Sequence, residues 1–188
     1  MKAIVGVARW LISVLFLLRR RMGVRHRTCF FSRQASRLSP DFALLQQQLR
    51  KADPTMDIVT ICCRYRGRQD GLLRFLRQCV RSVFLAASAQ VCVLDGYWPT
   101  ICLLRDKRDL RVIQIWHSVG KIKKSGYQTL DKPSGRSGAM ARALCMHRNY
   151  DAIIAGGPAW NPFYCAAFDV TEDRLRNGGL PRVDHLVS

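Results

Sequence analysis

The stretch RVIQIWHSVGKIKK, residues 111–124, begins as an apolar run and ends in a histidine, a glycine and three lysines. Residues 111–116 have the length and the apolar content of a strand buried in a sheet. His117 follows directly, and the turn behind it carries Gly120, Lys121, Lys123 and Lys124. The stretch predicts a strand that ends in a cationic turn, with an imidazole beside a pocket of phosphate size.

Strand-like and helix-like segments alternate along the rest of the chain. Strands are expected at residues 28–31, 57–63, 90–94, 111–116 and 152–155, and helices at residues 41–52, 71–87, 100–104, 139–147 and 159–168. This alternation is typical of a parallel sheet with crossover helices. We therefore expect an α/β fold, with one Rossmann-like domain over residues 28–178. Ligands of such sheets bind beyond the carboxyl ends of the strands, which is where His117 falls.

Residues 1–27 depart from the pattern of a plain domain. The segment from Ala3 to Leu18 is nearly all apolar, is broken by Arg9, and is followed at once by three arginines. It falls short of the roughly 20 residues that cross a bilayer, and an arginine at its centre would add about 2.5–3.5 kcal/mol to insertion. We expect a membrane-associating helix that lies in the interface of an anionic leaflet. A true span and a cleaved leader are the alternatives, although a leader carries its charges before the apolar stretch.

The totals limit what the chain can be. Its 188 residues, 48% of them hydrophobic, suffice for one domain with a real core. The formal net charge of +18 predicts attraction to polyanions, which include nucleic acid, anionic lipid and phosphate-rich substrates. The eight cysteines lie mostly in apolar or periodic runs and form no C-x-x-C pair. We interpret them as reduced, buried thiols rather than disulfides or metal ligands, and we expect no metal and no cofactor.

Several side chains could carry chemistry at the predicted sheet edge. His117 could act as a general base near neutral pH, or it could cap a helix or satisfy a core hydrogen bond. Lys121, Lys123 and Lys124, with Gly120, could neutralise phosphates, or they could form a solvated loop.

Further candidates follow other predicted strands and loops. Asp95 ends a strand at the same edge and could orient His117 or a substrate hydroxyl, or it could simply form a turn with Gly96. The turn-rich segment of residues 131–138 could be a mobile loop that presents Arg136 to a phosphate, or a solvated linker. Residues 32–34 follow the first strand and are further candidates for substrate contact.

Five motifs together resemble the CDP-glycerol glycerophosphotransferases of teichoic acid synthesis. The motifs are FSRQ at residues 31–34, VLDGY at 93–97, VIQIWH with GKIKKSGYQ over 112–128, MHRNYD at 146–151 and GLPRVD at 179–184. The resemblance covers about residue 28 to the end. It implies membrane association and a two-domain, glycosyltransferase-B-like fold, with the acceptor side on the N-terminal domain and the CDP-glycerol pocket mainly on the C-terminal one.

The resemblance also implies a chemistry for His117. This residue would deprotonate the terminal glycerol hydroxyl of the acceptor, which would attack the β-phosphorus of CDP-glycerol and release CMP. The chain departs mildly from the family at residues 118–120, which read Ser-Val-Gly where Ala-Leu-Gly is common. Residues 179–188 resemble the start of a linker to a C-terminal nucleotide-binding domain. The chain thus resembles the acceptor half of an enzyme, whose other half could be separately encoded.

The expected partners follow from the same resemblance. They are CDP-glycerol, a lipid-linked polyol phosphate acceptor and the anionic surface at the cytoplasmic face of the cell membrane. No nucleic acid is expected, because no zinc spacing, RNP-like strand or helix-turn-helix signal occurs. The alternative is a non-catalytic basic module that binds a membrane-linked polyanion or nucleic acid.

Overall fold

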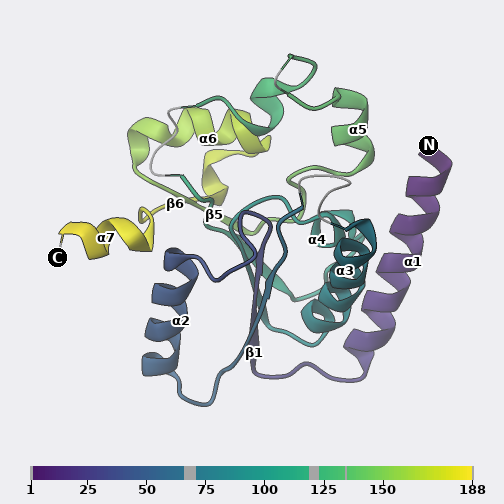
Figure 1. Cartoon of the computed structure of the whole chain (residues 1–188), viewed down its shortest axis with the longest axis horizontal. Coiled ribbons are helices and arrows are strands. Elements are labelled where there is room, and N and C mark those ends of the chain that lie inside the picture. Colours follow the sequence, from purple (N-terminus) through teal and green to yellow (C-terminus); the bar gives the residue numbers. More distant parts are fainter. Residues whose placement is uncertain (1, 66–70, 119–122, 134, 188) are drawn as a thin grey trace.

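The chain folds around one parallel β-sheet (Figure 1). The structure, a computed structural model, describes residues 2–65, 71–118, 123–133 and 135–187. The strands are β1 (Arg27–Ser32), β2 (Asp57–Cys62), β3 (Val91–Leu94), β4 (Arg111–Gln114), β5 (Ala152–Ala155) and β6 (Leu175–Asn177). They pair in the order β2-β1-β3-β4-β5-β6, and every pairing is parallel. The expected α/β fold with a parallel sheet is confirmed, with β6 as an additional strand.

Helices connect and cover the strands. They are α1 (Lys2–Arg21), α2 (Pro40–Ala52), α3 (Leu72–Ala87), α4 (Pro99–Leu103), α5 (Gly138–Ala143), α6 (Asn161–Phe168) and α7 (Pro181–Val187), with 3₁₀ turns η2 (Gly126–Thr129), η3 (Pro158–Trp160) and η4 (Glu172–Arg174). Helix α5 ends four residues before the predicted end at His147. The reason is local, because Cys145 and His147 both have positive φ angles, which an α-helix excludes.

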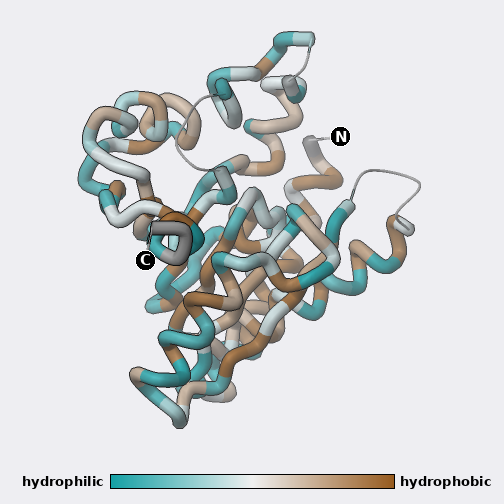
Figure 2. Tube along the Cα trace, turned by 60° about the vertical axis from the view of Figure 1, so that its left-hand side comes forward, coloured by the Kyte–Doolittle hydropathy of each residue, from teal (hydrophilic) through white to brown (hydrophobic). Residues whose placement is uncertain are grey.

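The two faces of the sheet have separate apolar cores. On one face, Phe30 of β1 meets Phe42 of α2 edge to face, with ring centroids 5.0 Å apart. On the other face, Cys29 and Phe31 pack in the larger core, to which α1, α3 and α4 contribute. Figure 1 shows α2 on one side of β1 and these three helices on the other. In Figure 2 the segments in the middle of the molecule are mostly hydrophobic, as two buried faces require.

Helix α1 lies against α3 and α4. Phe16 is fully buried in the larger core. Arg20 is also buried, and its guanidinium binds Asp109 and donates to the carbonyl oxygen of Ala89 at 2.9 Å. Membrane association of residues 1–27 stays a prediction. Within the described part of the chain, no helix combines the length and the hydropathy that a bilayer crossing needs.

The C-terminal residues 179–187 also pack on the domain. Helix α7 contacts α2 through Arg182, whose backbone N–H donates to buried Asp41 at 3.0 Å and whose guanidinium pairs with the same carboxylate. That residues 179–188 begin a linker to another domain, and that the sheet is one half of a glycosyltransferase-B-like fold, stay predictions.

The eight cysteines all lie in the described part of the chain, and none is in a disulfide. Five of them are buried, which fits the expected reduced thiols. Burial raises the pKa of Cys29 and of Cys79 to about 12, so that the thiol is the stable form at neutral pH.

The strand order positions the site. From β1 the chain moves to β2 on one side, whereas β3 lies on the other side, so the connections change direction between β1 and β3. Crevices at the carboxyl side of such switch points bind ligands in open α/β sheets. Phe31 pairs with Leu94 in this register, which brings the residues after β1 next to those after β3.

Candidate active site

The turn after β4 is held in a strained shape. Trp116 has a φ angle of +62°, which is rare for a bulky side chain and costs about 1–3 kcal/mol. The buried side chain of Gln114 stabilises this turn through both polar atoms of its amide. Its Oε1 accepts from the Trp116 backbone N–H at 2.9 Å, and its Nε2 donates to the Gly96 carbonyl at 3.1 Å. The ends of β4 and β3 are thereby tied together at the position of His117.

A main-chain contact fixes the imidazole of His117. Its Nδ1 lies 2.8 Å from the carbonyl oxygen of Asp95. Since a carbonyl can only accept, Nδ1 carries the proton, and in the neutral ring Nε2 is the basic nitrogen. The Trp116 ring lies against the imidazole, with centroids 4.1 Å apart. The ring is half-buried, and its orientation is set by the backbone of Asp95, the residue after β3, and by the Trp116 ring.

His117 lies on a cavity of about 330 Å³. Its walls come from the ends of β1, β3 and β4 and from the loops that precede and follow α5. The lining residues are Gln34, Tyr97, Trp116, His117, Lys124, Ser125, Gly126, Thr129, Gly135, Arg136, Met146 and His147. His117 is thus half-buried on the wall of a cavity, and its role as a general base stays a prediction.

The predicted cationic residues are only partly brought together. Lys124 and Arg136 are exposed and line the cavity, whereas Lys123 is exposed and is not among its lining residues. Gly120 and Lys121 lie outside the described residues. The cavity thus has at least two cationic side chains together with the imidazoles of His117 and His147, an arrangement suited to an anionic substrate.

Asp95 contacts His117, but through its backbone. Its carboxylate is 2% exposed and does not line the cavity, so the expected contact of this side chain with a substrate has no geometric support. Burial raises the pKa of this carboxyl to about 6, although the Ser32 hydroxyl and the Arg33 backbone amide favour its charged form. Neither carboxylate oxygen makes a close hydrogen bond within the described residues.

The loops around the cavity are tied down by specific contacts. Gly126 has a φ angle of +57°, and a Cβ there would lie 2.1 Å from the Ala167 carbonyl oxygen, so only glycine fits. In the segment predicted as a mobile loop or a linker, Asp131 is tied to residues 136–138. The Asp131 N–H donates to the Arg136 carbonyl at 2.9 Å, and its carboxylate accepts from the Gly138 N–H at 2.8 Å. These contacts present Arg136 to the cavity.

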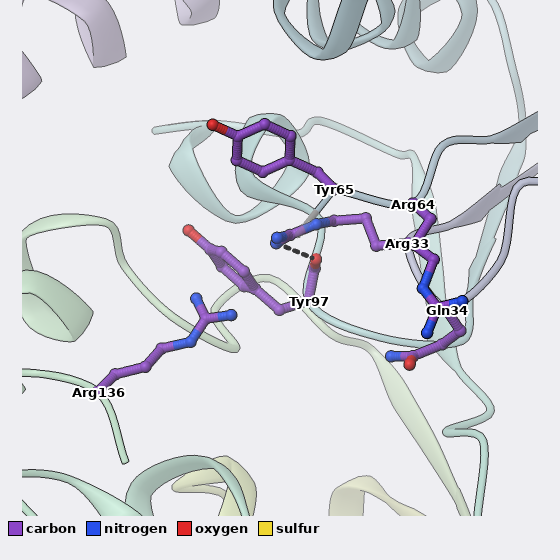
Figure 3. A pocket seen from close by; sticks show the side chains of 6 residues that line it. All are labelled: Arg33, Gln34, Arg64, Tyr65, Tyr97 and Arg136. Carbon is purple, nitrogen blue, oxygen red and sulfur yellow. Dashed lines mark hydrogen bonds between the residues drawn. The ribbon is translucent and has the colours of Figure 1, made fainter. Parts of the chain in front are cut away.

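A second cavity, of about 290 Å³, adjoins the first one (Figure 3). It is lined by Arg33, Gln34, Arg64, Tyr65, Tyr97 and Arg136, and three of these residues also line the cavity of His117. The candidate segment of residues 32–34 therefore does reach a cavity. Arg64 and Tyr65 were not predicted as site residues. The sequence feature that could have identified them is their position directly after a predicted strand, at the edge of the sheet where His117 also lies.

Across the described residues, no three His, Cys, Asp or Glu side chains are grouped as a metal ion would need.

Comparison with known proteins gives a consistent result. The family described as CDP-Glycerol:Poly(glycerophosphate) glycerophosphotransferase matches residues 14–188. A teichoic acid ribitol-phosphate primase of Bacillus spizizenii is 29% identical over 98% of this chain and 46% of its own length. The teichoic acid ribitol-phosphate polymerase TarL of Staphylococcus aureus is 31% identical over 56% of this chain and 18% of its own length.

Solved structures share the fold. The wall teichoic acid polymerase TagF superposes with a TM-score of 0.68 over 99% of this chain and 48% of that chain, at 16% identity. A TagF variant soaked with CDPG superposes with a TM-score of 0.66 over 99% of this chain and 50% of that one. The chain spans about half the length of these proteins and of the primase.

Proposed function

Because the chain belongs to the CDP-glycerol:poly(glycerophosphate) glycerophosphotransferase family, we propose that it is the acceptor-side half of a transferase of teichoic acid synthesis. Its substrate is a membrane-linked polyol phosphate acceptor. The nucleotide of the donor, CDP-glycerol, binds mainly to a C-terminal half that completes the enzyme.

His117 is the general base of this proposal. Nε2 takes the proton of the acceptor's terminal hydroxyl while the hydroxyl oxygen forms a bond to the β-phosphorus of CDP-glycerol. The bond between that phosphorus and the oxygen bridging to the α-phosphorus breaks, and CMP leaves with the electron pair. Lys124 and Arg136 stabilise the negative charge on the phosphoryl oxygens. The product is an acceptor longer by one glycerol phosphate.

One observation carries the proposal. The Asp95 carbonyl accepts from Nδ1 at the edge of a cavity that also has Lys124 and Arg136 on its walls. This contact leaves Nε2 as the basic nitrogen, which is the state that a general base at neutral pH requires. A base, an anion-binding wall and a volume of about 330 Å³ suit an alcohol next to a phosphate.

The identity of the donor, CDP-glycerol or CDP-ribitol, is a more specific part of the proposal. Some relatives are named ribitol-phosphate enzymes, and a more distant one is a glycerol-phosphate primase of Bacillus subtilis, 22% identical over 56% of this chain. Both CDP-glycerol and CDP-ribitol therefore belong in the assay, with CDP-glycerol as the expected substrate.

We further propose that the domain works as a peripheral protein at the cytoplasmic face of the cell membrane. The outward side of α1 carries exposed Val7, Leu11 and Leu18, and the neighbouring helix α3 carries exposed Leu73 and Val80. At the end of α1, Arg19 and exposed Arg21 follow Leu18 and add positive charge. Exposed apolar groups beside cations suit the interface of an anionic leaflet.

The test is CMP release from CDP-glycerol in the presence of a lipid-linked acceptor. The 188-residue chain is assayed together with a separately expressed C-terminal half. We expect His117→Ala to lower turnover by about 10²–10⁴-fold, the usual contribution of a general base. His26→Ala is the matched control, because His26 is exposed at the amino end of β1, at the other end of the sheet. Near-normal turnover of His117→Ala would refute the role of the base.

A further inference from the structure

The second cavity concentrates positive charge without a counter-charge. Arg33, Arg64 and Arg136 come from three separate segments, and Figure 3 shows Arg33 and Arg136 pointing toward Tyr97 from opposite sides. None of the three makes an ion pair with a carboxylate in the described parts of the chain. Like charges gathered in a partly desolvated pocket repel each other, and a bound anion relieves this repulsion.

Arg33 is positioned rather than mobile. Its Nη1 donates to the Tyr97 carbonyl at 3.1 Å, and its guanidinium lies 5.3 Å from the Phe75 ring centroid and 5.7 Å from that of Tyr97. Its Nε is buried and has no hydrogen-bond partner among the described residues. Burial and the nearby charge of Arg136 lower the pKa of Arg33. An oriented guanidinium with an unused donor is suited to bind a phosphate oxygen.

The two cavities share three lining residues. Gln34, Tyr97 and Arg136 line both of them, so a ligand that fills one cavity borders the other. In a polyol phosphate chain, a phosphodiester follows the terminal hydroxyl after a few bonds. A hydroxyl at His117 would therefore bring that phosphodiester to the arginines.

The position of the cavity favours the acceptor over the donor. Tyr65 on its wall stacks on Phe75 of α3, with ring centroids 4.7 Å apart. The same end of α3 carries exposed Leu72, Leu73 and Leu76, next to the face that we propose to contact the membrane. A lipid-linked chain that comes from that face would pass the arginines before it reaches His117.

We propose that Arg33, Arg64 and Arg136 form a subsite for the phosphodiester next to the terminal hydroxyl of the acceptor. The inference rests on the proposed function and makes it more specific. Arg33 and Arg64 are positioning residues, because they hold the hydroxyl at His117 and do not touch the reacting atoms. Arg136 lines both cavities and therefore serves the subsite as well as the transferring phosphoryl group.

The first arm of the test is binding of inorganic phosphate to the 188-residue chain by calorimetry. We expect Arg64→Gln and Arg136→Gln each to weaken binding by about tenfold, as the loss of a charged hydrogen bond implies. Arg50→Gln is the matched control, since Arg50 is exposed on α2 and loses the same charge elsewhere. Arg33 is left intact because its packing supports the fold. Equal affinities in all four proteins would overturn the subsite.

The second arm is kinetic and separates the two proposals. In the completed enzyme, we expect Arg64→Gln to raise KM for the acceptor about tenfold, with KM for CDP-glycerol and the pH profile of kcat unchanged. Arg64→Lys should recover part of the loss. A raised KM for CDP-glycerol instead would refute the acceptor assignment. Loss of turnover in His117→Ala with no effect of Arg64→Gln would leave the proposed function intact and remove the subsite. If phosphate binding depends on the arginines but the unmodified protein transfers nothing, the subsite would stand and the proposed function would fall.

Discussion

At the scale of single residues, Asp95 helps to build the site through its backbone and destabilises the fold through its side chain. Its carbonyl orients His117, whereas its carboxylate is buried with no close hydrogen bond in the described chain. The unfolded carboxyl has a pKa of 3.8, and the folded one has a pKa of about 6. Because each pKa unit corresponds to about 1.4 kcal/mol, burying this charge costs the folded state about 3 kcal/mol at neutral pH.

This cost predicts a pH dependence of stability. Between about pH 4 and pH 6 the folded chain binds more protons at Asp95 than the unfolded chain, so the contribution of Asp95 to the free energy of unfolding falls as pH rises. Asp95→Asn removes the charge. We expect the variant to exceed the unmodified protein in stability by up to about 3 kcal/mol at pH 7 and by little at pH 4. Urea unfolding at the two pH values measures the difference.

Asp53 is a matched control, because folding shifts the pKa of its carboxyl in the opposite direction. Hydrogen bonds from Thr55 and His26 lower the pKa of partly exposed Asp53 to about 2, so its stabilising contribution is present above pH 4 and is lost as pH falls toward 2. Asp53→Asn should therefore not gain stability at pH 7. Asp95→Asn should also keep its transfer activity, because the carbonyl that holds His117 remains. A destabilised Asp95→Asn at pH 7 would contradict this account.

Residue-level prediction from the sequence was limited by what a pattern can specify. The strand that ends at a histidine located His117 at the sheet edge, and the turn-rich segment located Arg136 near it. The pattern cannot tell a carboxylate contact from a carbonyl contact, which is why the role of Asp95 was placed on its side chain. Arg64 was missed because an arginine after a strand is ordinarily a solvated charge.

At the scale of elements, α1 shows how tertiary contacts resolve an ambiguous run. An apolar helix with a basic end has the same sequence pattern whether it lies on a membrane or on a protein. In the structure its inward side packs on α3 and α4 through Phe16, with the Arg20 guanidinium 5.7 Å from the Phe16 ring centroid. Strand β6 escaped prediction for a related reason, since its three residues include exposed Arg176 and Asn177 and show no strand periodicity.

The docking of α1 can be tested by one cavity-creating substitution. Phe16 is fully buried, so Phe16→Ala should lower the free energy of unfolding by about 3–5 kcal/mol. It should also speed hydrogen exchange in α1, because the contact with the domain is weakened. Leu18→Ala, at an exposed position of the same helix, should change stability by less than about 1 kcal/mol. Similar values for the two variants would show that α1 does not dock in solution.

At the scale of the whole molecule, charge and apolar surface point to the same kind of partner. The formal net charge of +18 attracts any polyanion, and charge alone therefore cannot separate lipid from nucleic acid. The exposed apolar side chains of α1 and α3 favour a partner with an apolar interior, such as a lipid leaflet, over nucleic acid. Binding to a membrane should thus depend on both features, and the two can be varied independently.

The experiment compares the 188-residue chain on vesicles with and without phosphatidylglycerol, by co-sedimentation. Binding to the anionic vesicles should weaken as salt screens the cations. Replacing Leu72 and Leu73 together by serine removes two exposed apolar side chains from the start of α3, where Leu73 is 83% exposed. We expect affinity to fall by about tenfold or more, since burying each leucine side chain contributes about 1.5 kcal/mol or more. Leu38→Ser, at an exposed leucine between β1 and α2, should leave affinity unchanged. If the double variant binds like the unmodified chain while salt still releases both, attraction between charges accounts for the whole effect and α3 does not enter the interface.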